Sequence, residues 1–219
     1  MAAPEAGPLR MMATLGIAGM CSGLALVGIF LLTLPMIERN RAEALEAAIF
    51  EVLQGATERV TFVLREGVLA RFESPGGRLP KEEAIYAGYD EAGQLVGFAI
   101  PAEGAGFQDT IKLIYGYDPA RRRVVGMQVL ESRETPGLGD KIIKDDSFLD
   151  CFRDLAVSPD VVAVKTGRTQ DNEIDAISGA TISSVAVVRI INEANARWIE
   201  RLPEPEGTTG AAGAGGSGE

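Results

Sequence analysis

The sequence predicts an α+β protein in which a single N-terminal transmembrane helix is followed by an antiparallel-sheet domain with flanking helices. Three observations lead to this fold class. Residues 11–37 carry no charge. From residue 57 onward, short runs of β-branched and aromatic residues alternate with turn signals. The last apolar pattern, from Thr181 to about Arg201, has the spacing of a helix.

The uncharged run lies between Arg10 and Glu38. A membrane core of about 30 Å needs about 20 apolar residues in a helix, so this run is long enough to span it. We therefore expect residues 1–10 to be a cytoplasmic N-terminus and residues 11–37 to be a transmembrane helix. The alternative is a cleaved signal peptide, but the apolar region of such a peptide is usually only ~7–15 residues long.

A helical stalk is expected over residues 38–56, in continuation of the transmembrane helix. Apolar residues recur there at helical spacing: Ala44, Leu45, Ala48, Ile49 and Val52. Gly55 follows them and is a typical signal for the end of a helix.

A folded domain is expected over residues 57–202. Five runs predict strands: RVTFVL, AIYAGYD, QLVGFAI, DTIKLIYGYD and RVVGMQVLES. The segments YDEAGQ and YDPARR have Asp at the start and Gly or Pro inside, which predicts hairpin turns and antiparallel pairing. A helical stretch, DKIIKDDSFLDCF, a short strand, VVAVKT, and the final helix follow. Residues 203–219 are rich in Pro, Gly and Ala and are expected to be disordered.

The composition excludes several classes of function. The chain has 31 acidic against 21 basic side chains, whereas nucleic-acid binding requires a basic surface. It has no histidine, the commonest general base and transition-metal ligand. Cys21 and Cys151 are far apart, so the chain alone offers neither an iron–sulfur cluster nor a zinc ribbon, and we expect no metal site. If the protein carries electrons, it therefore needs an organic cofactor.

The stretch DAISGATISS leads directly into the final helix. Gly179 can adopt positive φ and turn the chain sharply, and either Ser178 or Thr181 can cap the helix. The first N–H groups of a helix have no internal partner and attract a phosphate, to which a hydroxyl at this position could be esterified. From the residues alone, an ordinary N-cap loop is the favoured explanation of this stretch.

Two further stretches could contribute to a site. In ESRETPGLGDKI, Pro136 restricts the backbone and two glycines free it, so the loop can connect a strand to a helix or lie beside a planar ligand, with Thr135 offering a hydroxyl. The segment AGFQDTIKLIYGYD reads as a core strand with an incoming loop.

Together, and behind one membrane anchor, these stretches resemble the covalent-flavin domain found in the G subunit of the Rnf electron-transport complex and in the C subunit of the sodium-translocating NADH:quinone reductase. The resemblance covers roughly Tyr86 to Trp198. The flavin-attachment motif of that family is matched by Asp175, Ser178, Gly179, Ala180 and Thr181. A second motif, E-T-P-G-L-G, is matched by Glu134, Thr135, Pro136, Gly137, Leu138 and Gly139.

The resemblance implies that FMN is bound covalently, through its phosphate, to Thr181. It implies that the E-T-P-G-L-G loop lies against the flavin. Ser183 and Ser184 lie further into the helix and are expected to contact the phosphate without being attachment points. No residue is expected to be catalytic, because the subunit would relay electrons without turning over a substrate by itself.

The function that the resemblance implies is electron transfer within an ion-translocating ferredoxin:NAD oxidoreductase (Rnf) complex of the bacterial inner membrane. Its partners would be the other subunits, membrane lipid and a flavin transferase. The flavin domain would lie on the periplasmic side, although Arg10 on one side of the membrane helix and Arg39 and Arg41 on the other do not decide the orientation. The alternatives are a subunit of the quinone-reductase type and a non-redox, membrane-anchored binding module.

Overall fold

The computed structural model describes residues 7–72, 80 and 82–202, and it divides into two units between Glu43 and Ala44. The part of the expected cytoplasmic N-terminus before residue 7 and the expected disordered tail, residues 203–219, lie outside the described residues.

A single long helix, α1 (Pro8–Val52), makes up the described part of the first unit and continues into the second. Within the described ranges it is the one helix that is long and apolar enough to cross a membrane, by length and composition. Large apolar side chains along its first part, from Leu9 to Met36, are exposed, as side chains that face lipid would be. The uncharged run and most of the expected stalk therefore belong to one continuous helix.

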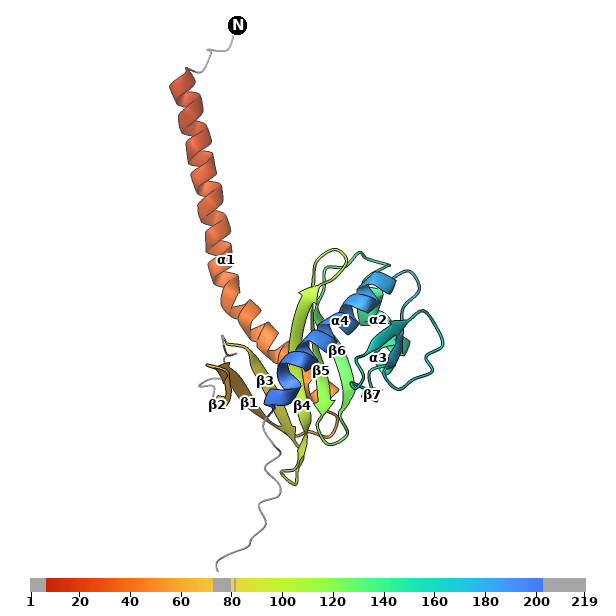
Figure 1. Ribbon diagram of the computed structural model, residues 1–219. Coiled ribbons are helices and arrows are strands. Elements are labelled where there is room, and N and C mark those ends of the chain that lie inside the picture. Colours follow the sequence, from red (N-terminus) through yellow and green to blue (C-terminus); the bar gives the residue numbers. More distant parts are fainter. Residues whose placement is uncertain (1–6, 73–79, 81, 203–219) are drawn as a thin grey trace, which may run out of the picture. The chain divides into compact units, whose positions relative to one another are not determined.

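The second unit is built on a seven-stranded antiparallel sheet in the order β2-β1-β3-β4-β5-β6-β7 (Figure 1). The strands are β1 (Glu58–Arg65), β2 (Val68–Phe72), β3 (Ala84–Tyr89), β4 (Leu95–Ala105), β5 (Thr110–Asp118), β6 (Arg123–Glu131) and β7 (Leu155–Ala156). The five runs expected from the sequence form β1 and β3–β6, and the antiparallel pairing is confirmed.

The two expected hairpin turns join β3 to β4 and β5 to β6. In the first, the Asp90 carboxylate accepts hydrogen bonds from the backbone N–H groups of Ala92 and Gln94, at 2.9 and 2.8 Å. Asp118 does the same in the second, with Ala120 and Arg121 as donors. These Asp side chains satisfy turn N–H groups, which is why Asp at the start of each segment was a useful signal.

The remaining elements lie mainly toward the C-terminal end of the chain. They are α2 (Lys141–Lys144), α3 (Asp146–Asp150), β8 (Val162–Val164), β9 (Glu173–Asp175), α4 (Thr181–Trp198) and a 3₁₀ turn, η1 (Ile199–Arg201). The helical stretch and the final helix appear where the sequence predicted them. The strand predicted in VVAVKT is β8, which pairs in parallel with β9 as a separate two-stranded sheet.

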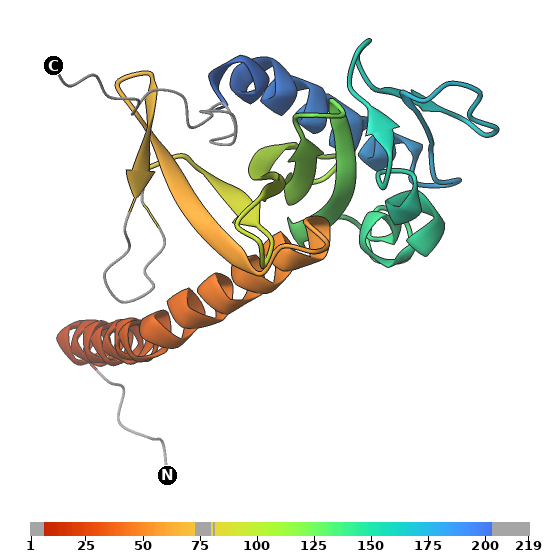
Figure 2. The same ribbon diagram turned by 90° about the horizontal axis from the view of Figure 1, so that it is seen from below.

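The two faces of the large sheet pack against different helices, and Figure 2 shows the end of α1 in orange and α4 in blue on opposite sides of the strands. Side chains alternate between the faces along each strand. On β4, Phe98 and Ile100 face the core that contains α4, whereas Ala99 faces the smaller cluster that contains the last turns of α1. In that cluster Ile49 and Leu53 are completely buried.

Four glycines in neighbouring strands allow the end of α1 to approach the sheet closely. They are Gly88, Gly97, Gly116 and Gly126, and we call them the glycine track. A Cβ at Gly116 would collide with the Val52 carbonyl oxygen, and one at Gly88 would lie 2.8 Å from Leu53 Cδ1. The residues around Val52 can therefore occupy this position only because the four glycines of the track carry no side chain.

Candidate functional site

Three loop segments that are distant in sequence meet at the N-terminus of α4. They are the β4–β5 loop at residues 106–109, the E-T-P-G-L-G loop at residues 134–139, and the turn at residues 175–181. Thr135 Oγ1 donates a hydrogen bond to Gln108 Oε1 at 2.7 Å, which joins the first two loops. Leu138 reaches the third, because a Cβ at Gly179 would lie 3.8 Å from Leu138 Cδ2. The fold thus brings together the three stretches that the sequence analysis singled out.

The carboxylate of Glu134 holds this junction together from inside. Glu134 is only 5% exposed. Its Oε1 accepts hydrogen bonds from the backbone N–H groups of Phe107 and Gln108, at 2.9 and 3.0 Å, and its Oε2 accepts one from Ser183 Oγ at 2.7 Å. One buried side chain therefore connects the β4–β5 loop, its own loop and the first turn of α4.

The environment of Glu134 favours its ionised form. Burial alone would raise the pKa of Glu134, but hydrogen bonds from Ser183 and from the backbone N–H groups of residues 107–109 outweigh burial and hold the pKa below its usual value. The carboxylate is thus a fixed negative charge with its oxygens directed at protein donors. Glu134 was expected to contact the flavin; in the structure its carboxylate faces inward, toward Ser183 and the β4–β5 loop.

Two glycines provide the room that the Glu134 carboxylate occupies. A Cβ at Gly106 would collide with Glu134 Oε1, and one at Gly139 would lie 2.6 Å from Oε2 and 3.0 Å from Ser183 Oγ. Glycine is therefore required in both loops by close packing.

Thr181 is the first residue of α4, and its side chain is exposed. Its hydroxyl makes only a long hydrogen bond, 3.4 Å, to the carbonyl oxygen of Ile177. Within the described residues, the backbone N–H groups of Thr181, Ile182 and Ser183 have no hydrogen-bond acceptor. This hydroxyl therefore stands beside three free N–H groups, an arrangement that favours an anion.

The capping expected for this helix does not occur. The N-cap residue is Ala180, and neither Ser178 nor Thr181 makes a side-chain cap. Instead Ser184, one turn into the helix, accepts a hydrogen bond from Ile177 N–H at 3.1 Å and donates one to the Ala180 carbonyl at 3.0 Å. The turn is fixed by Ser184 from inside the helix, and the hydroxyls of Ser178 and Thr181 take no part in capping.

Ser183 and Ser184 were expected to contact a phosphate, but both are buried. The Ser183 hydroxyl is committed to Glu134, and the Ser184 hydroxyl is committed to the turn. The side chains of both serines therefore have structural roles, whereas the backbone N–H group of Ser183 remains, among the described residues, one of the three free ones. In a helix only one side of the first turn faces outward, and Ser183 and Ser184 lie on the other side.

The other residues of the two motifs lie around the N-terminus of α4. Asp175 is half-buried at the end of β9, and its carboxylate accepts a hydrogen bond from Arg168 N–H at 3.1 Å, so it orders the preceding turn. Pro136 and Gly137 are exposed, with Gly137 at a φ of 78°. Gly179 has a φ of 82°, as the sharp turn into the helix requires.

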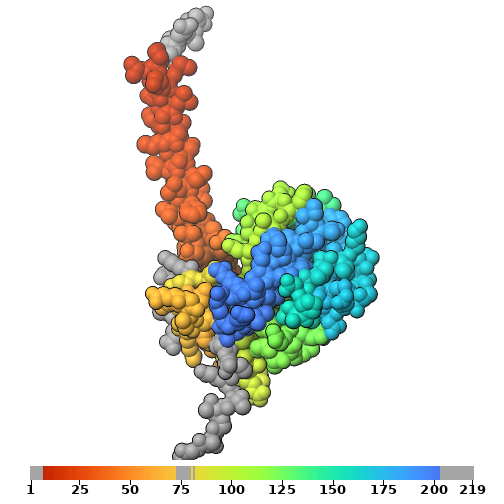
Figure 3. Space-filling model, in the orientation of Figure 1, coloured from red at the N-terminus to blue at the C-terminus, as the bar shows by residue number. Residues whose placement is uncertain are grey.

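Apolar side chains are exposed around Thr181. Phe107 is 64% exposed, Leu138 51% and Ile182 60%. Phe107 belongs to the β4–β5 loop, Leu138 to the E-T-P-G-L-G loop and Ile182 to the first turn of α4. The space-filling view shows the outer side of α4, in blue, at the surface of the domain (Figure 3). An anion-attracting helix mouth bordered by apolar side chains fits a ligand that joins a phosphate to a planar apolar ring, and FMN is such a ligand.

Lys141 is a candidate site residue that the sequence analysis missed. It begins α2, directly after the E-T-P-G-L-G loop, and its Nζ donates a hydrogen bond to the Ser178 carbonyl at 3.3 Å. Lys141, Asp175 and Ser178 line a hollow of about 330 Å³ beside the turn. Its position two residues after the motif was visible in the sequence, but nothing local indicated that it would reach a turn so far along the chain.

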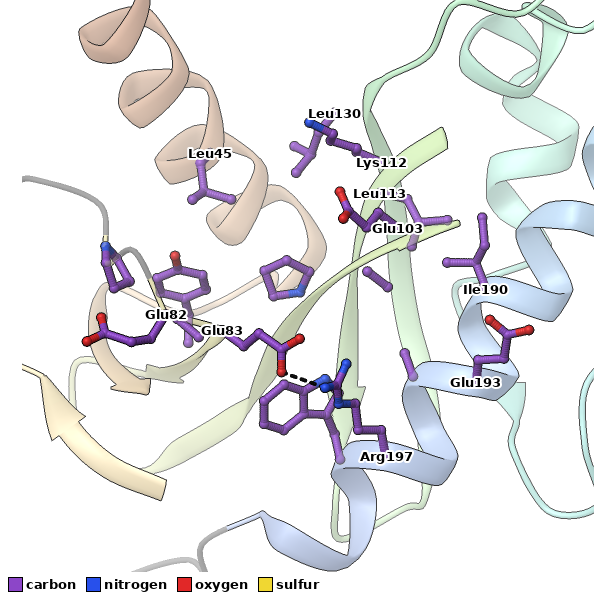
Figure 4. Close-up of a pocket in the computed structure, with 17 residues that line it drawn as sticks. Leu45, Glu82, Glu83, Glu103, Lys112, Leu113, Leu130, Ile190, Glu193 and Arg197 are labelled. Carbon is purple, nitrogen blue, oxygen red and sulfur yellow. Dashed lines mark ion pairs between the residues drawn. The ribbon is translucent and has the colours of Figure 1, made fainter. Parts of the chain in front are cut away.

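A larger cavity, of about 550 Å³, lies elsewhere in the second unit and contains none of the motif residues. It is lined by residues of β3, β4 and α4, and Figure 4 shows Ile190, Glu193 and Arg197 along one side, with Glu83 and Arg197 forming an ion pair of 2.9 Å. We place the candidate site at the mouth of α4 because the chemistry-bearing side chains converge there, and volume alone does not identify a site.

The comparisons with known proteins match the part of the chain that contains these segments. Residues 106–196, a range that contains all three meeting segments, match the family model described as an FMN-binding domain. The G subunit of the ion-translocating oxidoreductase complex of Methanosarcina acetivorans is 39% identical over 109 residues, which are 50% of this chain and 55% of that protein. The G subunit of the proton-translocating ferredoxin:NAD(+) oxidoreductase complex of Clostridium ljungdahlii is 33% identical over 101 residues, 46% of this chain and 52% of that protein.

Two solved structures share the fold. NqrC of Shewanella oneidensis has a TM-score of 0.58 over 74% of this chain and 98% of that chain, at 17% identity. The C subunit of the Na(+)-translocating NADH-quinone reductase of Parabacteroides distasonis gives 0.58 over 76% and 96%, at 18% identity. The chain spans about half the length of the curated relatives it matches. The region that carries the site thus matches the family model of an FMN-binding domain, and about half of the chain is similar in sequence to G subunits of ion-translocating oxidoreductase complexes.

Proposed function

We propose that this protein is a membrane-anchored flavoprotein subunit that carries FMN as a phosphoester of Thr181 and relays electrons within an Rnf-type ion-translocating oxidoreductase complex. One observation carries the attachment site: within the FMN-binding domain, the exposed Thr181 hydroxyl stands beside the free N–H groups of the first turn of α4. FMN supplies the redox chemistry when bound, and this chain supplies binding and orientation.

Each group of the site would have a separate role. The N–H groups of the first turn of α4 would hold the phosphate. Leu138, Ile182 and Phe107 would border the ring, and residues 135–138 would contact the flavin. Glu134 would keep the loops in register from inside. A covalent attachment suits an electron carrier, because a tethered flavin has a high effective concentration at its partner and does not exchange with a free pool.

The first unit would anchor the domain. Residues 11–37 would cross the inner membrane in contact with lipid, as one continuous helix with the residues that follow. The other subunits of the complex would be the partners of both units. A separate flavin transferase would attach the FMN, and the flavin domain would lie on the periplasmic side.

The covalent attachment is tested on the full chain, co-produced with a flavin transferase. We expect a fluorescent band after denaturing electrophoresis and an intact mass increased by that of FMN less one water. Fluorescence that disappears entirely on denaturation would contradict the ester and leave noncovalent binding.

Thr181→Val tests the site itself. This substitution removes the hydroxyl and nearly preserves the size of the side chain. Because that hydroxyl makes only one long hydrogen bond, we expect folding to survive with a loss below about 1 kcal/mol, while covalent flavin disappears. Ser178→Ala is the matched control, with a hydroxyl removed three residues earlier, and it should keep the ester. A folded Thr181→Val chain with stoichiometric covalent FMN would place the attachment elsewhere.

A further inference from the structure

Lys141 and Lys144 are both in the short helix α2, but their charges are compensated differently. Lys144 forms an ion pair with Asp140 at 2.6 Å. Lys141 has no carboxylate within ion-pair distance among the described residues, and its Nζ donates to the Ser178 carbonyl. A carbonyl dipole is a weak partner for a full positive charge, so the charge of Lys141 is available to an anion.

The surroundings of Lys141 direct this charge toward the turn that precedes Thr181. A Cβ at Gly179 would lie 3.9 Å from Lys141 Nζ, so the ammonium group lies against the glycine of the motif. Two carboxylates line the same hollow, Asp145 and Asp175. Each accepts a hydrogen bond from a backbone N–H group, that of Phe148 for Asp145 and that of Arg168 for Asp175. Asp145 caps α3 and Asp175 orders the turn before β9, and neither forms an ion pair with Lys141 among the described residues.

We propose that Lys141 is the counter-ion of the phosphate ester at Thr181, a positioning residue that holds the phosphate against the N–H groups of the first turn of α4. This inference rests on the proposed function, because it requires an ester at that residue. A phosphodiester keeps one negative charge at neutral pH. Before attachment the lysine holds the turn through the Ser178 carbonyl, and its flexible side chain can transfer to the phosphate oxygen once that stronger partner is present.

The contribution of Lys141 can be separated from any general effect on folding by comparing chains with and without the ester. The full chain is purified in detergent after production with and without the transferase, as wild type, Lys141→Gln, Lys141→Arg and Lys144→Gln. The first measurement is the ³¹P resonance of the attached phosphate. We expect this resonance to move in Lys141→Gln, to return toward its wild-type position in Lys141→Arg, and to stay unchanged in Lys144→Gln.

The second measurement is the difference in Tm between the loaded and the unloaded form of each variant, in which purely structural effects of a substitution cancel. We expect this difference to fall by about 2–4 °C in Lys141→Gln and to be unchanged in Lys144→Gln. A ³¹P resonance and a Tm difference that are the same in Lys141→Gln as in the wild type would overturn the role of Lys141 while leaving the ester intact. A wild-type chain without covalent flavin would overturn the proposed function, and this inference with it.

Discussion

At the scale of single residues, the site depends on buried side chains as well as on exposed ones. Glu134 is buried, accepts three hydrogen bonds at 2.7–3.0 Å and connects segments 49 positions apart in sequence. Its direction could not be predicted, since a glutamate in a glycine-rich loop reads as exposed. By contrast, the start of the final helix at Thr181 and the positive φ of Gly179 could be predicted, because a sharp turn into a helix leaves a local pattern.

Glu134→Gln is expected to destabilise the domain in a pH-dependent way. The native pKa of Glu134 lies below its ordinary value of 4.5. Its charge therefore contributes stability that is fully present above the unfolded-state pKa and is lost as the pH falls through the native pKa. Glutamine cannot accept all three hydrogen bonds equally well, so we expect a loss of about 1–3 kcal/mol at pH 7. The difference from wild type should shrink below pH 4.5, as measured by urea unfolding at several pH values.

An unchanged difference across that pH range would show that the charge of Glu134 does not matter. Glu134→Asp is a suitable control, because it keeps the charge but shortens the side chain. Its destabilisation relative to wild type should persist at neutral pH and should likewise shrink in acid.

Gly139→Ala is expected to disturb the site through packing. The added methyl would lie 2.6 Å from Glu134 Oε2 in a buried position, and overpacking of this kind costs about 1–3 kcal/mol. We expect a lower free energy of unfolding and less covalent flavin per chain. Gly137→Asn is the control: nothing lies within 4 Å of a Cβ there, and asparagine tolerates positive φ. Equal flavin content in both variants would contradict the packing argument.

At the scale of elements, the sequence predicted the strands with strong alternation and the final helix, and it did not predict how they are covered. Strands β2, β7 and β9 were missed, and the latter two have only two and three residues, too few for a periodic signal. A glycine inside a strand weakens that strand in general, so the sequence gives no local reason for the glycines at positions 88, 97, 116 and 126. Only the structure shows that they lie in neighbouring strands beneath the end of α1.

Added side chains at different positions of the glycine track are expected to destabilise the domain by different amounts. A Cβ at Gly116 would overlap the Val52 carbonyl oxygen, whereas one at Gly126 would lie 3.2 Å from Val52 Cα, a contact that a small shift can relieve. We expect Gly116→Ala to lower the free energy of unfolding by about 1–3 kcal/mol and Gly126→Ala to lower it by less. Thermal or urea unfolding of the two variants measures the order. The reverse order would show that the end of α1 does not rest on the track.

At the scale of the whole molecule, the boundary between anchor and domain differs from the one the sequence indicated. Gly55 and a change of hydrophobic period near residue 57 suggested a separate stalk and a domain that starts after it. In the structure the second unit begins at Ala44, because the last turns of α1 bury Ile49, Val52 and Leu53 on the sheet. The apolar residues at helical spacing from Ala44 to Val52 indicate a helix that buries one face, but they do not indicate what covers that face, so the sequence alone did not identify the sheet as the packing partner.

Two truncated chains test this boundary. A chain that begins at Ala44 keeps the covering helix, and we expect it to be soluble without detergent and to unfold cooperatively. A chain that begins at Thr57 lacks Ile49, Val52 and Leu53, whose burial contributes about 1.5–3 kcal/mol each. That sum approaches the whole stability of a typical domain, ~5–15 kcal/mol, and the glycine track and Tyr86 would become exposed. We therefore expect the shorter chain to aggregate or to lose its cooperative circular-dichroism transition, and a Tm equal to that of the longer chain would show that the end of α1 is a free stalk.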